Sequence, residues 1–163
     1  MCPTAFPADV TLDVADRAML SDLVHRYAAR IDDRQFDSAA ELFADDAELV
    51  LPDPPATLEP VSRHRGSPAI GDALAAVAAT IRTQHAIVGE VYDIGPRQGT
   101  ARGRIVCIAH HWVEHADQIR NVVWHLRYDD EYQHLDSRWR IHRRVLTVDA
   151  VETRPVRQVR REG

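Results

Sequence analysis

The most unusual absence from this 163-residue sequence is lysine, because all twenty basic side chains are arginine. Without lysine, no side chain can form a Schiff base or attach pyridoxal phosphate. A phosphate-binding loop that depends on its lysine is excluded for the same reason. Any chemistry must therefore come from other side chains.

Cysteine is scarce as well. Cys2 lies near the amino terminus and Cys107 lies in an apolar strand pattern, so the two do not form a disulfide framework. Cys107 reads as a small core residue rather than a nucleophile. The first fourteen residues lack a basic start and a sustained apolar run, and no stretch approaches the length of a membrane span. We therefore expect a cytoplasmic protein with no membrane contact.

Charge and length predict a single globular domain. The net charge is −5, which argues against a nucleic-acid partner, and 45% of the residues are hydrophobic. The last ten residues are locally basic, and a solvated tail is a better reading of them than a nucleic-acid arm. We expect a flexible amino terminus over 1–14, one domain over 15–152 and a basic tail over 153–163.

Helical patterns fill the first half of the chain. Asp13 or Asp16 can cap a first helix that runs to about Ile31. A short second helix is predicted over 36–43, and an alanine-rich third helix is predicted over 67–82. Between them we expect a short strand over 48–51 and a proline-rich loop over 52–66.

Strand patterns fill the second half, over 84–94, 100–114, 119–133 and 139–151. Three helices followed by a meander of long strands indicate an α+β fold. We expect a curved antiparallel sheet, shaped like a cone, with the helices packed on one face around an internal pocket.

One carboxylate stands out within the first helix. Leu20, Val24, Ala28 and Asp32 are spaced by four residues, so Asp32 continues an apolar row. A carboxylate on a buried helix face is costly unless a partner uses it. A histidine is a suitable partner, because Asp can fix its tautomer and raise its basicity. Such a pair beside a tyrosine transfers protons without a cofactor or a metal. The alternative is that Asp32 only caps the helix end.

The order of the elements, together with five sequence stretches, resembles the SnoaL-like branch of the nuclear transport factor 2-like superfamily. The matching stretches are Tyr27–Asp33, Leu42–Ala47, Thr83–His85, Arg127–Tyr132 and Trp139–Ile141, followed by Arg144. The resemblance implies a cone-shaped fold and includes polyketide cyclases, scytalone dehydratase, bile-acid dehydratase and a dehydrochlorinase.

The resemblance also implies site residues. The His–Asp pair of these lyases maps onto His85 and Asp32, and their tyrosine maps onto Tyr27. A second histidine is similarly placed at His110, and an arginine on the last strand maps onto Arg144, less closely onto Arg143. Homodimers are common among such proteins, so the resemblance also implies a homodimer.

Several other residues have more than one interpretation. His110 and His111 point to opposite faces of one strand, and periodicity does not choose between them. The same alternation, and the lack of an acidic partner at ligand spacing, argues against a metal held by His110, His111 and His115. Trp112, Trp124 and Tyr128 are candidates for contact with substrate, although core packing explains them equally well. The run Asp129–Glu131 reads as solvated charges or as partners for arginine.

The function expected from this sequence is that of a cofactor-independent lyase or isomerase, of dehydratase or cyclase type, acting on a hydrophobic cyclic small molecule. His85 would remove a proton from carbon, Asp32 would orient the imidazole, and Tyr27, His110 or Arg144 would donate a hydrogen bond. The alternative is a non-catalytic ligand-binding protein, or an assembly module like the small subunit of dioxygenases. An Asp–Arg–Asp epoxide hydrolase is a weaker alternative, because its second Asp and its Arg are not evident.

Overall fold

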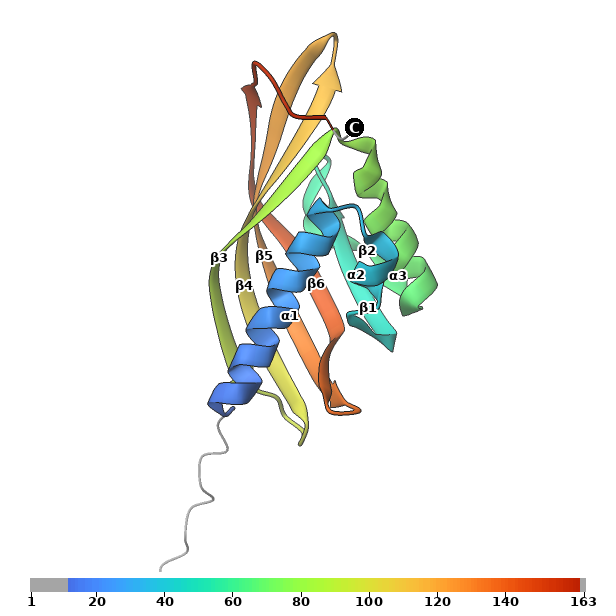
Figure 1. Cartoon of the computed structure of the whole chain (residues 1–163), viewed down its shortest axis with the longest axis vertical. Helices are drawn as coiled ribbons and strands as arrows, with labels where there is room; N and C mark the ends of the chain where they lie inside the picture. Colours follow the sequence, from blue (N-terminus) through green and yellow to red (C-terminus); the bar gives the residue numbers. More distant parts are fainter. Residues whose placement is uncertain (1–11, 162–163) are drawn as a thin grey trace, which may run out of the picture.

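A computed structural model describes residues 12–161 and shows helices on one side of a bent, strongly twisted sheet (Figure 1). The six strands are ordered β2-β1-β6-β5-β4-β3. The helical elements are α1 (Val14–Asp32), α2 (Phe36–Ala40), α3 (Gly66–Ala75) and the 3₁₀ turn η1 (Ala76–Ala79). The strands are β1 (Phe43–Asp53), β2 (Thr57–Arg65), β3 (Arg82–Ile94), β4 (Thr100–His115), β5 (Gln118–Leu135) and β6 (Arg138–Pro155). The predicted α+β class and the curved sheet with its helices are confirmed.

The first helix forms as its sequence predicts. Asp13 is its N-cap, and its side chain accepts a 2.7 Å hydrogen bond from the backbone N–H of Asp16. Leu20, Val24 and Ala28 are buried against the sheet. Because Asp32 is the last residue of the same row, the helix carries its carboxylate to the edge of the interior.

Four predicted elements differ in the structure. The second helix ends at Ala40, and the first strand runs over Phe43–Asp53 rather than 48–51. The proline-rich segment is not a loop, because β2 pairs with β1 in a hairpin. It is an edge strand, which tolerates Pro60 since one side of its backbone needs no ladder partner. The third helix is also shorter than predicted, ending at Ala75 and continuing as η1.

The sheet is mixed rather than wholly antiparallel. Strand β1 lies parallel to β6, with Leu49 opposite Arg144, whereas the other neighbours are antiparallel. A parallel pair needs a long connection between its strands, and here β2, α3 and β3–β5 supply it. Strand β6 also extends to Pro155, past the predicted start of the tail. Of the predicted flexible segment, residues 1–11 lie outside the described residues.

Candidate active site

A mostly apolar pocket of about 340 Å³ lies between the helices and the sheet. This volume is at the lower end of the range for small-molecule sites, about 300–1,000 Å³. It is lined by Tyr27, Ile31, Leu51, Pro52, Ala73, Leu74, Ala76, Val77, Thr80, His85, His111, Val113, Val122, Trp124, Leu126, Tyr128 and Leu146. Among these described lining residues there is no carboxylate and no guanidinium.

Asp32 and His85 are in direct contact. Nδ1 of His85 lies 2.7 Å from Oδ1 of Asp32, and the backbone N–H of His85 donates to Oδ2 at 2.8 Å. The hydroxyl of Thr83 also donates to Oδ1, at 2.9 Å. A carboxylate at a helix C-terminus meets the negative end of the helix dipole, so these three donors offset an unfavourable position.

These contacts keep Asp32 ionised and determine which nitrogen of His85 donates. Burial alone would raise the pKa of Asp32, but the hydrogen bonds from His85 and Thr83 outweigh it and leave the pKa below its ordinary value. Because Asp32 is then an acceptor, Nδ1 of His85 carries a proton, and in the neutral ring the lone pair lies on Nε2. His85 lines the pocket, and its side chain is 8% exposed. The geometry provides an oriented base at the pocket wall.

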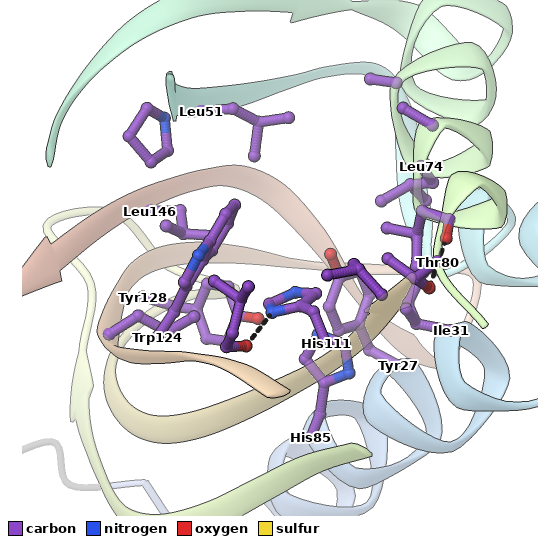
Figure 2. A pocket seen from close by; sticks show the side chains of 17 residues that line it. Tyr27, Ile31, Leu51, Leu74, Thr80, His85, His111, Trp124, Tyr128 and Leu146 are labelled. Atoms are coloured by element: carbon purple, nitrogen blue, oxygen red, sulfur yellow. Dashed lines mark hydrogen bonds between the residues drawn. The ribbon is translucent and has the colours of Figure 1, made fainter. Parts of the chain in front are cut away.

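Tyr27 stands on the same wall, and Figure 2 shows its ring beside the two histidines. Its ring packs edge-on against Phe43 and Tyr128, with centroids 6.0 Å away in each case. Burial raises the pKa of Tyr27, which is opposed by the nearby Arg144, so the phenol keeps its proton. It is therefore a neutral hydrogen-bond donor.

Arg144, which the resemblance places among the site residues, is not one of the residues that line the pocket. The guanidinium is fully buried, and its Cζ lies 4.2 Å from the ring centroids of both Tyr27 and Tyr128. Its Nε and Nη2 donate to the two oxygens of Asp130 at 2.8 and 2.6 Å. The hydroxyl of Tyr132 donates to the same carboxylate at 2.6 Å. Arg144 therefore packs against the rings of Tyr27 and Tyr128, which themselves line the pocket.

The second histidine that lines the pocket is His111, whereas the resemblance favoured His110. His111 lies opposite Thr83 in the β3–β4 register, and its ring is 6.1 Å from the ring of His85. His110 lies on the other face of the strand, where Asn121 donates to its Nδ1 at 2.8 Å. Trp112 stacks on His110 with ring centroids 5.6 Å apart, and it does not line the pocket either.

A signal in the sequence could have identified His111. It shares its strand parity with Ala101, Ile105 and Cys107, which are all buried. The opposite parity begins with Arg102 and Arg104, which are exposed and mark the outer face. The two predicted aromatic contacts Trp124 and Tyr128 do line the pocket, and the ring of Trp124 lies 4.6 Å from that of His111.

Sequence reasoning also missed Arg34, which holds the pocket rim. Its guanidinium donates to the carbonyls of Val77 and Thr80, at 2.7 and 2.8 Å, and to the hydroxyl of Thr80. Val77 and Thr80 line the pocket. Arg34 follows the helix end with a φ of 61°, a conformation that usually favours glycine. No sequence pattern marks this contact, because its partners are backbone atoms far along the chain.

Cys107, considered above as a nucleophile, is a core residue. The thiol of Cys107 is fully buried, and burial raises its pKa to about 12.

Within residues 12–161 no three His, Cys, Asp or Glu side chains gather closely enough to hold a metal ion. In the same part of the chain, no helix combines the length and the apolar character needed to cross a membrane.

A bent sheet covered by helices, with an apolar pocket between them, defines a class of small α+β proteins that enclose a ligand-sized space. The model of the SnoaL-like domain matches residues 13–145, and the chain belongs to this family, within the nuclear transport factor 2-like superfamily. No curated protein matches the chain.

Three solved structures illustrate the shared fold. Kfla4162 from Kribbella flavida is 23% identical over 85% of this chain and 93% of its own, with a TM-score of 0.72. The type 2 hexachlorocyclohexane dehydrochlorinase LinA is 18% identical over 92% and 95%, with a TM-score of 0.71. ActVI-ORFA from Streptomyces coelicolor is 17% identical over 83% and 98%, with a TM-score of 0.66.

Proposed function

We propose that the protein is a cofactor-independent lyase or isomerase of the dehydratase or cyclase type. In this proposal, His85 removes a proton from a carbon next to a carbonyl group in a hydrophobic cyclic molecule. The observation that carries the proposal is the 2.7 Å contact between His85 Nδ1 and Asp32 Oδ1, beside an apolar pocket. A base held in this way has its lone pair free for the substrate.

The pair has the parts that proton abstraction needs. Asp32 fixes the tautomer of His85 and stabilises the imidazolium that forms when the proton is taken. Three hydrogen bonds hold Asp32 itself, so the base is positioned before substrate binds. General-base catalysis of this kind typically contributes about 10²–10⁴-fold.

Tyr27 is suited to the charge that develops on the carbonyl oxygen. Its phenol is protonated and lies on the same wall as His85. A hydrogen bond donated into an apolar pocket is worth more than one in water. Abstraction at carbon and stabilisation of the resulting oxyanion are shared by dehydration, cyclisation and isomerisation, so the proposal covers these three reactions.

The comparisons support the reaction class. The chain belongs to the SnoaL-like family. One structural neighbour is named as a dehydrochlorinase of hexachlorocyclohexane, a cyclic and apolar molecule. The alternative of a binding or assembly module would be favoured by separated Asp32 and His85 side chains, and the two side chains lie in contact.

Exchange at carbon tests the proposal without a known substrate. The probe is 1-indanone, whose C2 protons exchange with deuterium in D₂O and can be followed by NMR. We expect the protein to accelerate this exchange, and we expect His85→Ala and Asp32→Asn to lower the acceleration by about 10²-fold or more.

The matched control is His110→Ala, on the outer face of β4, which should exchange at the rate of the unchanged protein. Circular dichroism confirms that each variant is folded. A folded His85→Ala variant with an undiminished rate would overturn the assignment of His85 as the base.

A further inference from the structure

The tautomer of His111 is fixed by a backbone contact. Its Nδ1 lies 3.1 Å from the carbonyl oxygen of Val122, the residue opposite it on β5 (Figure 2). A carbonyl oxygen only accepts hydrogen bonds, so Nδ1 must carry the proton. Nε2 is then left with a lone pair, and among the described residues no hydrogen bond to Nε2 occupies it.

His111 is also uncharged. Burial lowers its pKa to about 4, and the neighbouring His85 acts in the same direction. At neutral pH the ring therefore cannot supply a proton from its Nε2. It presents only an acceptor to the pocket that it lines.

An acceptor in this position becomes costly when a ligand without a donor displaces water from it. The lining around it is apolar, including Val113, Val122 and Trp124. Leaving a desolvated acceptor without a partner costs about 1–3 kcal/mol. The hydroxyl of Thr80, another polar group of the lining, already donates to the carbonyl of Val77 at 2.8 Å.

We infer that the pocket takes an uncharged cyclic compound carrying a hydroxyl group, and that this hydroxyl donates a hydrogen bond to Nε2 of His111. His111 is then a specificity-determining residue. This inference deepens the proposed function, and it rests on that function in taking the ligand to be a substrate. The ring of His111 lies 6.1 Å from that of His85, so a single small molecule can contact both.

The absence of charge on the ligand follows from the same lining. Neither a guanidinium nor a carboxylate is found among the described lining residues, and Arg144 is screened by Tyr27 and Tyr128 while it pairs with Asp130. A charged group entering this pocket would lose its hydration without gaining a partner. We therefore expect carboxylates and phosphates to be rejected.

Four bicyclic probes of similar size separate the possibilities: indane, 5-indanol, 5-methoxyindane and indane-5-carboxylate. Their affinities for the full chain are measured by calorimetry at neutral pH. We expect 5-indanol to bind about tenfold or more tightly than indane, and 5-methoxyindane to bind no better than indane. The carboxylate should bind more weakly than all three.

His111→Phe keeps an aromatic ring but removes the acceptor. In this variant 5-indanol and indane should bind with similar affinity, and continued binding of indane shows that the pocket persists. His111→Gln offers a carbonyl oxygen and should restore part of the preference. The control is His110→Phe, the same change one residue away on the outer face, which should keep the full preference.

The outcomes distinguish the two proposals. If His111→Phe keeps the preference for 5-indanol, or if 5-methoxyindane binds as tightly as 5-indanol, the assignment of His111 is wrong. If His85→Ala abolishes the preference while His111→Phe keeps it, His85 is the acceptor instead. An undiminished deuterium exchange in His85→Ala would overturn the proposed base and leave the binding preference standing.

Discussion

The hydroxyl of Thr83 donates to Oδ1 of Asp32, the same oxygen that the ring of His85 contacts. Thr83 is 3% exposed and lies two residues before His85 on β3, so one strand supplies all three donors to this carboxylate. The orientation of the base therefore depends on a residue that does not line the pocket.

Replacing Thr83 by Val tests this dependence, because the change keeps the shape of the side chain and removes its donor. We expect the exchange rate of 1-indanone to fall roughly five- to tenfold and the free energy of unfolding to fall by about 1–2 kcal/mol. Because the pKa of Asp32 is lower in the folded protein than in the unfolded chain, the ionised carboxylate stabilises the fold at pH values above its ordinary pKa. This stabilisation is lost as the pH falls through the folded-state pKa. Thr83→Val should shift that loss to higher pH, whereas Thr147→Val on β6 should not.

The stability of the protein should depend on His111 in acid. In the unfolded chain a histidine binds a proton near its ordinary pKa of 6.5, whereas in the folded protein burial lowers the pKa of His111 to about 4. Between these values the unfolded state binds more protons, so stability declines as the pH falls through this window, by at most roughly 3 kcal/mol. Urea denaturation at several pH values should show a shallower decline for His111→Phe. An equal change in His110→Phe would contradict this prediction.

The buried pair of Arg144 and Asp130 should be sensitive to the loss of one partner. Arg144→Met leaves a buried carboxylate unpaired and should lower the free energy of unfolding by about 3–5 kcal/mol. The double variant Arg144→Met, Asp130→Leu should recover much of that loss in urea denaturation. The outer pair of Arg127 and Asp129 gives the comparison, because Arg127→Met should cost less than about 1 kcal/mol.

Arg34 should control the opening of the pocket rim. The backbone N–H of Thr80 donates to the carbonyl of Val77, the same carbonyl that Arg34 binds. In Arg34→Ala, hydrogen exchange at the Thr80 amide should become about tenfold faster, because the three hydrogen bonds from Arg34 to the rim are lost. Arg34→Gly should behave similarly at the rim even though glycine suits the φ of 61°. Arg30→Ala, which releases the carbonyl of Ser38 instead, should leave the Thr80 amide unchanged.

The pairing of Asp32 with His85 could be anticipated because each residue carries a local signal and the family resemblance joins the two. A four-residue spacing places Asp32 on the inner row of α1, and the Thr83–His85 stretch resembles a known family pattern. The extent of the long strands was also predictable, since alternation persists along most of β4 to β6. These features depend on neighbours in sequence, which a pattern records.

The features that the sequence did not predict depend on contacts between distant parts of the chain. The direction in which Arg144 points depends on its pairing with Asp130 across β5 and β6, and the fit of its guanidinium depends on Tyr27 from α1. Strand β2 was not anticipated because its pattern is weak, and the register against β1 holds it in place. The role of Arg34 was not predictable, since it binds backbone carbonyls more than forty positions away.

The histidines and tyrosines of the pocket come from α1 and the sheet, whereas much of the rim comes from Leu51, Pro52, Ala73 and Val77 on β1, α3 and η1. None of these four side chains takes part in holding Asp32 or His85. The entrance can thus be enlarged or narrowed by mutagenesis while the base remains intact. This separation makes the scaffold a practical starting point for engineering catalysts that accept molecules of different shape.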